Sequence, residues 1–339
     1  MAYKASPERY NEMKYNYCGK SGLKLPAVSL GLWHNFGSNA DMENMKAMCF
    51  KAFDLGITHF DLANNYGPEK GSAEENFGKI LHEHMADYRD EMIISTKAGY
   101  TMWEGPYGDW GSRKYLMASL DQSLKRMGLD YVDIYYHHRM DPKTPLEETM
   151  GALADIVRSG KALYVGISNY DGPTLARAEE IMETLNCPLV INQNRYSILD
   201  RTIEINGLKK MARRLRKGVI AYSPLAQGLL TDRYLDGIPQ DSRIRTDGRF
   251  LQERDLTSER MDQIKKLNDM AIERGQSLSQ MALSWVLNDE NITSVLIGAS
   301  TPEQIEKNVS AINQPGFNEN ELAEINKISI GHIDEVSIN

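Results

Sequence analysis

The sequence predicts an α/β fold, a (β/α)8 TIM barrel with a short N-terminal hairpin and a long loop after the seventh strand. Eight short apolar runs rich in β-branched residues alternate with amphipathic stretches of helical period. Most of these runs are apolar on both faces, as expected of parallel strands buried between layers. An open doubly wound sheet would have a GxGxxG loop after its first strand, whereas residues 31–37 read GLWHNFG. The closed barrel is therefore favoured.

The elements begin with a hairpin within residues 13–34, where Gly19 and Gly22 mark the turn. Strands are expected at 28–33, 57–63, 92–98, 131–138, 162–169, 189–194, 218–224 and 293–299. Helices are expected between and after them at 41–55, 72–84, 112–127, 146–158, 173–185, 204–216, 258–275, 277–288, 302–312 and 319–328. This alternation is the pattern of repeated βα units.

Local signals mark several helix ends. Ser72 with Glu75, and Ser277 with Gln280, have the spacing of a capping box and predict helix N-termini. Pro302 is expected in a first turn, where its missing N–H costs nothing. Glycines that end a helix just before the next strand are Gly56, Gly128 and Gly160.

One connection departs from the repeat. Residues 226–257 show no strand period and are rich in Gly, Asp and Arg. A loop of this length without secondary structure is usually functional or disordered. It follows the seventh strand, on the barrel face where loops build sites. The rest of the chain has no linker, tandem repeat or low-complexity segment, so residues 1–339 are expected to form a single domain.

Composition argues against several classes of partner. A formal net charge of −8 and a pI near 5.5 disfavour nucleic acid, because phosphate contacts need a basic face. Cys18, Cys49 and Cys187 lie far apart without a CxxC pair, which indicates a reducing, cytoplasmic compartment and no metal site. The N-terminus opens no signal region, and no window approaches the roughly 18 apolar residues of a membrane span, so no membrane partner is expected.

Polar residues at the strand ends of a barrel are catalytic candidates, because these ends meet at one mouth. Asp61, Lys97 and His138 end the second, third and fourth strands, and Tyr66 lies in the turn after Asp61. Each side chain alone is compatible with a structural role, but four at neighbouring strand ends favour catalysis.

These four residues suit proton delivery to a carbonyl. A free phenol has a pKa of ~10, and a nearby ammonium is expected to lower the pKa of Tyr66 and make it a better donor. Asp61 would hold Lys97 charged. His138 would hydrogen-bond the substrate oxygen.

A second set of residues fits a nicotinamide. Ser168-Asn169 and Gln193 offer a hydroxyl and amides for a carboxamide, and Tyr222 offers a flat face for stacking. Arg233 and Arg243 in the long loop suit phosphate, although each is also compatible with a solvated loop charge. Residues 298–300 (GAS) precede a helix N-terminus, which favours phosphate as well.

The chain resembles an aldo-keto reductase from Lys14 to Ile330. The matching segments are 56–63 (GITHFDLA) with Tyr66, 127–133 (MGLDYVD), 159–161 (SGK), 166–169 (GISN) and 222–225 (YSPL). The branch that it resembles most contains bacterial L-glyceraldehyde 3-phosphate (methylglyoxal) reductases and potassium-channel β subunits. The marks of that branch are 226–231 (AQGLLT), 237–239 (GIP) with 242–243 (SR), and 294–300 (SVLIGAS).

The resemblance implies NADPH-dependent reduction of small aldehydes, with Tyr66 as the general acid and Asp61, Lys97 and His138 as the other catalytic residues. It implies no metal and a homo-oligomer, a tetramer or larger. Basic residues at the positions of Arg233 and Arg243 contact the 2′-phosphate in the family, which implies NADPH over NADH. The positions that match cofactor-binding residues are Trp33, Asp61, Ser168, Asn169, Gln193, Tyr222, Ser223, Leu225, Gln227, Arg233, Arg243, Gly298, Ser300, Gln304 and Asn308.

Two other functions stay open at this point. The chain could be an NADPH-binding, redox-sensing regulatory subunit, although channel subunits often have Asn where this chain has His138. Lys97 could instead form a Schiff base, as in a lyase.

The residues after the third strand also allow two interpretations. The aromatic cluster that includes Trp103 and Trp110 would either form one wall of the substrate pocket or pad the barrel rim. Arg139, directly after His138, could meet an anionic substrate. The physiological aldehyde is not predicted.

Overall fold

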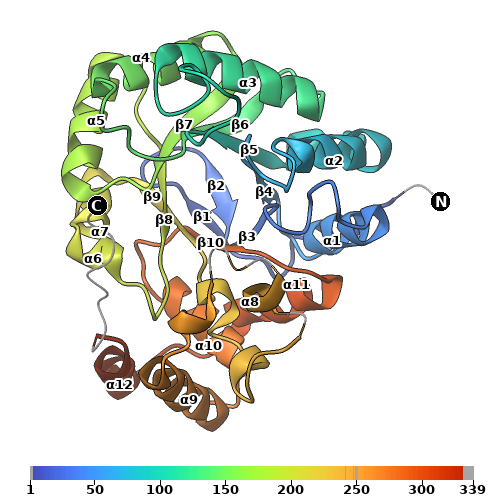
Figure 1. Ribbon diagram of the computed structural model, residues 1–339, viewed down its shortest axis with the longest axis vertical. Coiled ribbons are helices and arrows are strands. Elements are labelled where there is room, and N and C mark those ends of the chain that lie inside the picture. The colour runs from blue at the N-terminus through green and yellow to red at the C-terminus, as the bar shows by residue number, and fades with distance from the viewer. Residues whose placement is uncertain (1–2, 241, 247, 249–250, 331–339) are drawn as a thin grey trace.

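Eight parallel strands close into a barrel in the computed structural model, which describes residues 3–240, 242–246, 248 and 251–330 (Figure 1). The order around the barrel is β10-β3-β4-β5-β6-β7-β8-β9. The strands are β3 (Val28–Gly31), β4 (His59–Asp61), β5 (Ile93–Ala98), β6 (Val132–His137), β7 (Ala162–Ser168), β8 (Ile191–Arg195), β9 (Gly218–Tyr222) and β10 (Ser294–Ile297). Each overlaps its predicted range, so the predicted barrel is confirmed.

The helices surround the barrel (Figure 1). They are α1 (Met42–Asp54), α2 (Ser72–Ile80), α3 (Arg113–Met127), α4 (Leu146–Arg158), α5 (Gly172–Thr184), α6 (Thr202–Ile205), α7 (Leu208–Leu215), α9 (Ser258–Glu273), α10 (Leu278–Leu287), α11 (Pro302–Val309) and α12 (Glu319–Ile330). The helix predicted at 204–216 is split, because Gly207 adopts a left-handed φ of 78° between α6 and α7. As predicted, Pro302 begins α11, and left-handed glycines follow α1, α3 and α4 (Gly56, Gly128 and Gly160).

The two predicted capping boxes have different outcomes. At Ser277 the box is confirmed, because its N–H donates to Gln280 Oε1 at 2.9 Å and its Oγ accepts from the Gln280 N–H at 3.3 Å. At Ser72 the prediction is wrong. Gly71, with a φ of 94°, is the N-cap, and the Ser72 hydroxyl donates instead to the carbonyl of Glu69 at 2.6 Å.

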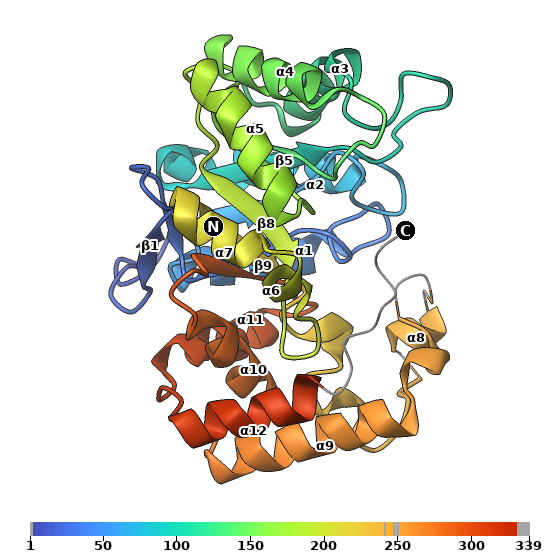
Figure 2. The same ribbon diagram turned by 90° about the vertical axis from the view of Figure 1, so that its left-hand side faces the viewer.

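The predicted hairpin plugs one end of the barrel. Its strands are β1 (Tyr15–Tyr17) and β2 (Lys24–Pro26), which pair antiparallel. The buried side chains of Cys18, Leu23 and Leu25 pack against Ile191 and Ile220 of the barrel strands. Figure 2 shows the hairpin and the short helix α8 (Arg243–Thr246) at opposite ends of the molecule. The C-terminal strand ends are therefore left as the open mouth.

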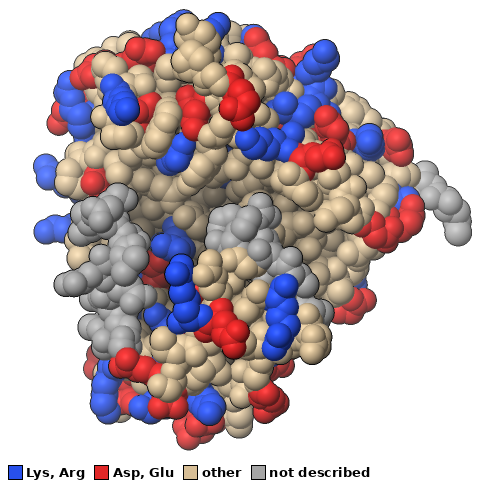
Figure 3. All heavy atoms as spheres, viewed as in Figure 1, with Lys and Arg blue, Asp and Glu red and all other residues tan. Residues whose placement is uncertain are grey.

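The long loop after β9 lies at that mouth. It is not wholly without secondary structure, because it contains α8 and three 3-10 turns at Ala226–Gly228, Asp232–Tyr234 and Glu253–Asp255. Leu230 and Tyr234 anchor it in the core. Figure 3 shows a hollow at the centre of this face, lined mainly by residues other than Lys, Arg, Asp and Glu. In the part of the chain that the structure describes, no helix is long and apolar enough to span a membrane.

Candidate active site

A buried ion pair forms the base of the site. Asp61 is the last residue of β4 and Lys97 lies on the neighbouring strand β5, and neither side chain is exposed. Lys97 Nζ donates to Asp61 Oδ2 at 2.5 Å and to the Leu62 carbonyl at 2.6 Å. Burial lowers the pKa of Lys97, and the charge of Asp61 opposes this shift. Because the amine is fully enclosed by these acceptors, the arrangement does not favour Schiff-base chemistry.

Tyr66 lies directly above this pair. Lys97 Nζ is 5.1 Å from the centroid of the Tyr66 ring, and the ring centroids of Trp33 and His138 are 6.2 and 6.1 Å away. The structure therefore brings together the four predicted catalytic residues.

The expectation of a lowered pKa for Tyr66 is wrong for this arrangement. Burial, and then the charge of Asp61, raise the pKa of Tyr66 well above its ordinary value. The physical reason is that the loss of water around the phenol, together with the nearby carboxylate, outweighs the attraction of the Lys97 ammonium for a phenolate. The phenol is therefore protonated at neutral pH and can serve as a donor.

His138 follows β6 directly and is buried beside Tyr66. Its ring meets that of Tyr100 edge-on, with 4.7 Å between the centroids. Burial, and then the charge of Lys97, hold the pKa of His138 well below its ordinary value, so the imidazole is neutral at pH 7. Its Nδ1 is buried and has no hydrogen-bond partner among the described residues. A neutral imidazole can still donate one hydrogen bond to a ligand.

The residues predicted to hold a carboxamide adjoin the ion pair. Gln193 on β8 donates from Nε2 to Asp61 Oδ1 at 3.2 Å. Tyr222, at the end of β9, donates from its hydroxyl to Asn169 Oδ1 at 2.8 Å. Asn169, next to Ser168 at the end of β7, donates in turn to the carbonyl of His138 at 3.0 Å. The two predicted sets thus form one continuous polar network.

Backbone strain is concentrated at the same strand ends. Four non-glycine residues after β7 and β9 have left-handed φ values between 47° and 62°, namely Asn169, Ser223, Ala226 and Gln227. Such conformations cost about 1–3 kcal/mol each and cluster where function needs them. Leu225 lies among them, and Trp33 follows β3 at the same end of the barrel.

The start of α11 fits the phosphate end of a dinucleotide. A Cβ added to Gly298, just after β10, would meet no heavy atom within 4 Å, so a ligand can approach the backbone. The Ser300 N–H donates to Gln304 Oε1 at 2.9 Å, and Asn308 is buried on the same helix. Asn169 and Gln193 offer amides for a carboxamide, and the start of α11 offers space for phosphates. The residues present therefore fit a nicotinamide dinucleotide.

The structure describes the two arginines of the long loop to different extents. Arg233 lies exposed in the turn Asp232–Tyr234. Arg243 begins α8, but its side chain lies outside the described part of the structure. Lys307 on α11 reaches toward the same loop, with 3.9 Å between its Nζ and Asp232 Oδ2.

The loop after β5 is fastened to the mouth by Arg139. The Arg139 guanidinium carbon lies 4.3 Å from the Tyr100 ring centroid and 3.7 Å from that of Trp110. Its Nη2 donates to Asp109 Oδ1 at 2.7 Å and its Nε donates to the Gly99 carbonyl at 2.8 Å. Arg139 therefore stabilises the loop and does not present an unpaired charge to a ligand.

The two tryptophans of this loop play different parts. Trp110 lies over the Arg139 guanidinium and is exposed. Trp103 packs against Tyr115 of α3, with 5.3 Å between the ring centroids, and so pads the loop from below.

Sequence reasoning missed one close neighbour of the catalytic residues. Ser95 donates from its hydroxyl to Asp61 Oδ1 at 2.6 Å. Ser95 precedes Lys97 by two positions, so the strand period already places both on one face of β5. That signal was sufficient to find it.

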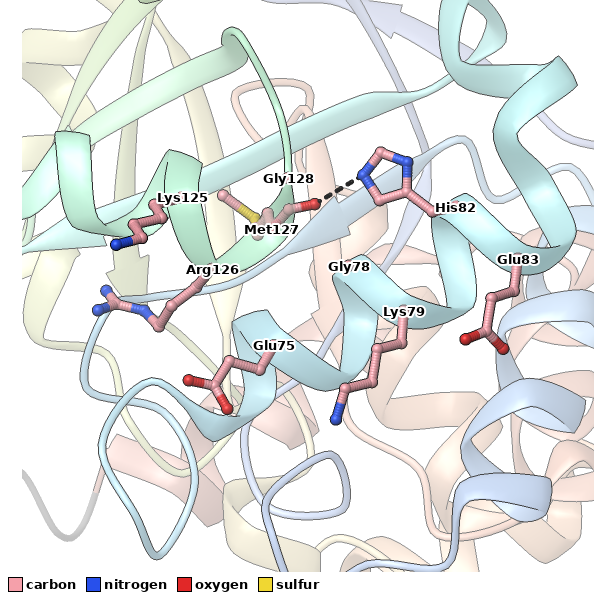
Figure 4. A pocket seen from close by; sticks show the side chains of 9 residues that line it. All are labelled: Glu75, Gly78, Lys79, His82, Glu83, Lys125, Arg126, Met127 and Gly128. Atoms are coloured by element: carbon pink, nitrogen blue, oxygen red, sulfur yellow. Dashed lines mark hydrogen bonds between the residues drawn. The ribbon is translucent and has the colours of Figure 1, made fainter.

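A pocket of about 340 Å³ lies elsewhere, on the outer surface between α2 and α3 (Figure 4). His82 Nε2 and the Met127 carbonyl are 3.1 Å apart at its edge. None of the predicted site residues lines it; its lining is Glu75, Gly78, Lys79, His82, Glu83, Lys125, Arg126, Met127 and Gly128. Within the described residues, no group of three His, Cys, Asp or Glu side chains could hold a metal ion.

Comparison with known proteins shows the family of the chain. The pattern of the Aldo/keto reductase family matches residues 27–330. The chain is 57% identical over 342 residues to the L-glyceraldehyde 3-phosphate reductase of Escherichia coli K12, covering 100% of this chain and 98% of the relative. It is 36% identical over 304 residues to a Schizosaccharomyces pombe protein named as a voltage-gated potassium channel subunit beta, covering 88% of each. An Arabidopsis thaliana protein of the same description is 34% identical over 306 residues, covering 89% of this chain and 92% of the relative.

Proposed function

This chain belongs to the aldo/keto reductase family and is an oxidoreductase, and from this premise we propose that it reduces small aldehydes to alcohols with NADPH. The observation that carries the proposal is the position of Tyr66 above the buried Lys97–Asp61 pair, with His138 beside it. A protonated phenol, a neutral imidazole and a fixed ammonium are the groups that a developing alkoxide needs.

Bound NADPH supplies the hydride that the carbonyl carbon receives. Tyr66 gives its phenolic proton to the carbonyl oxygen, so hydride and proton together convert C=O to CH–OH. The phenolate left on Tyr66 faces the Lys97 ammonium, whose Nζ is 5.1 Å from the ring centroid. The ammonium thereby stabilises a charge that burial alone would disfavour. Proton uptake from solvent then restores the phenol.

His138 donates a hydrogen bond to the same carbonyl oxygen. Because its pKa is held well below the ordinary value, it polarises the carbonyl as a neutral imidazole and does not compete with Tyr66 as the acid.

The cofactor is proposed to lie across the mouth from β7 to α11. Ser168, Asn169 and Gln193 would hold the carboxamide, and Tyr222 would stack on the ring. Gly298 and Ser300, with Gln304 and Asn308 on α11, would receive the phosphates, and Trp33, Ser223, Leu225 and Gln227 would complete the wall. The preference for NADPH over NADH rests on the sequence positions of Arg233 and Arg243.

The substrate is proposed to be a short aldehyde of the triose class, such as L-glyceraldehyde 3-phosphate or methylglyoxal. The identity of 57% to a protein named L-glyceraldehyde 3-phosphate reductase supports this choice. Arg139 is not counted among the phosphate ligands, because Asp109 and the Gly99 carbonyl already bond its guanidinium.

Stopped-flow measurements of NADPH oxidation over a panel of aldehydes, with and without a phosphate group, test the proposal. The same measurements with NADH at equal concentration give the cofactor preference. We expect turnover with short aldehydes and a preference for NADPH. Tight NADPH binding without oxidation by any aldehyde would instead favour a redox-sensing regulatory subunit. Cytoplasmic location, a single domain over 1–339 and a homo-oligomer of at least four subunits stay predictions, and light scattering tests the last.

A further inference from the structure

A chain of hydrogen bonds runs through the barrel interior and ends on Asp61. Ser294 Oγ and Ser29 Oγ are 2.7 Å apart, and Ser29 Oγ lies 2.9 Å from Nδ1 of His59. His59 Nε2 lies 2.9 Å from Ser95 Oγ, which donates to Asp61 Oδ1 at 2.6 Å. All five side chains are fully buried.

The chemistry of the last link fixes the direction of the whole chain. An ionised carboxylate only accepts, so Ser95 must give its one proton to Asp61 and accept from Nε2–H of His59. Burial lowers the pKa of His59 to about 4, so the ring is neutral at pH 7 and its Nδ1 is an acceptor. Ser29 then donates to Nδ1. From Ser29 onward each donor therefore points toward Asp61, and hydrogen bonds aligned in this way polarise one another.

We propose that His59 is a positioning residue for the reaction, which acts through Ser95 to fix the carboxylate of Asp61 and so holds Lys97 beneath Tyr66. This inference rests on the proposed function. Ser95 and Gln193 occupy Asp61 Oδ1, which leaves Oδ2 for the ammonium at 2.5 Å. Without the donation from Ser95, the carboxylate could rotate and the ammonium would move with it.

The location of the chain argues that it serves the site. Barrel interiors are normally filled by branched apolar side chains, and buried polar groups are costly unless every one is satisfied. Here both ring nitrogens of His59 have partners, and the one charged end of the chain is Asp61. Polar side chains with a packing role alone would not need a hydrogen bond to the catalytic carboxylate.

The titratable groups around the chain come from several elements. Asp61 shares β4 with His59, Lys97 stands on β5, and Tyr136 on β6 has its ring centroid 5.7 Å from Lys97 Nζ. The charge of Glu74 on α2 raises the pKa of Lys97 from the outer layer. Tyr66 covers the Lys97–Asp61 pair on the side of the mouth.

Four variants test the inference in the full-length protein. Ser95→Ala breaks the chain at the link to Asp61 and His59→Phe breaks it one link earlier, whereas His59→Gln keeps a donor toward Ser95 and an acceptor toward Ser29. Ser284→Ala is the matched control, since Ser284 is a buried serine whose hydroxyl donates only to the Met281 carbonyl of its own helix. Steady-state kinetics with an aldehyde, the pH profile of kcat and NADPH binding are measured for each.

We expect Ser95→Ala and His59→Phe to lower kcat by about ten-fold, while NADPH affinity stays unchanged. Ser95→Ala removes a hydrogen bond to the charged Asp61, and His59→Phe removes the donor that orients the Ser95 hydroxyl. The basic limb of kcat moves to higher pH, because a displaced Lys97 stabilises the Tyr66 phenolate less and the phenol holds its proton longer. His59→Gln restores most of kcat and the wild-type pH profile. Ser284→Ala matches the wild type.

Wild-type kcat and pH profile in a folded Ser95→Ala would overturn the inference, as would equal losses in Ser95→Ala and Ser284→Ala with no movement of the basic limb. Ser95→Ala removes a single oxygen, so it carries the test if His59→Phe does not fold. If the wild type reduces no aldehyde, the proposed function fails separately. Nitrogen NMR then tests the hydrogen-bond chain directly. A neutral His59 protonated on Nε2 at pH 7, together with a Lys97 pKa that changes in Ser95→Ala, would support the chain. The other His59 tautomer, or an unchanged Lys97 pKa, would contradict it.

Discussion

Two buried lysine–carboxylate pairs occur at opposite ends of the barrel strands. Lys97 and Asp61 meet at the C-terminal ends, at the mouth. Lys217, just before β9, meets Glu179 of α5, and both side chains are almost fully buried. Glu179 also accepts from the N–H of Leu189, which precedes β8, at 3.2 Å. The second pair therefore ties α5 to the starts of two strands.

The difference lies in what surrounds each pair. Asp61 accepts from Lys97, Ser95 and Gln193, and the ammonium lies 5.1 Å from the centroid of the Tyr66 ring. Glu179 is bonded to an ammonium and to backbone, and within the described part of the chain no predicted site residue is hydrogen-bonded to it. A buried ion pair by itself does not mark a catalytic site; its connection to a proton donor at the mouth does. The following predictions test this distinction.

The largest effect is expected from Tyr66→Phe. The substitution keeps the ring above Lys97 and removes only the proton, so kcat for aldehyde reduction should fall by about 10²–10⁴-fold. NADPH binding, measured by fluorescence, should be retained. Near-wild-type turnover in this variant would remove Tyr66 from the mechanism.

The two lysines can be compared directly by Lys97→Met and Lys217→Met. Each leaves a buried carboxylate unpaired, so each should lower the free energy of unfolding by about 3–5 kcal/mol, as measured with urea. Activity per folded molecule should fall by roughly 10²-fold for Lys97→Met only, because that lysine stabilises the phenolate. Equal losses of activity in the two variants would mean that stability, and not chemistry, explains the Lys97 effect.

The sequence located the mouth better than it described the environment there. Asp61, Lys97 and His138 could be found because parallel strands of a closed barrel end on one face. The direction of the pKa shift of Tyr66 was wrong, because it depends on burial, which no spacing encodes. His59 was overlooked although it precedes Asp61 by two positions and so shares its face of β4.

Helix boundaries show the same limit. The residues 72–75 have the spacing of a capping box, but the left-handed Gly71 shifts the N-cap by one position. Gly207 similarly separates α6 from α7 within a stretch that periodicity alone would read as one helix. Both outcomes depend on backbone conformations that glycine permits but does not require.

Stability should fall in acid because of buried neutral histidines. The pKa values of His59 and His137 are lowered from 6.5 to about 4 in the folded protein. The unfolded chain therefore binds more protons, so their contribution is complete above pH 6.5 and is lost as the pH falls toward 4, by roughly 3 kcal/mol each. Urea unfolding at several pH values checks this, and His59→Gln should reduce the slope. An unchanged slope in that variant would exclude His59 as a source.

The smallest effect is expected at Gly298, where the fold leaves space. Because a Cβ there meets no heavy atom within 4 Å, Gly298→Val should keep the free energy of unfolding, measured with urea, within about 0.5 kcal/mol of the wild type. The side chain would occupy the space proposed for the cofactor phosphates, and the Kd for NADPH should rise by about ten-fold, a cost of about 1.4 kcal/mol. Gly166→Ala is the opposite control, because its Cβ would lie 2.6 Å from the Tyr136 ring, and it should destabilise the fold. If Gly298→Val bound NADPH as tightly as the wild type, the phosphates would have to lie elsewhere on the mouth.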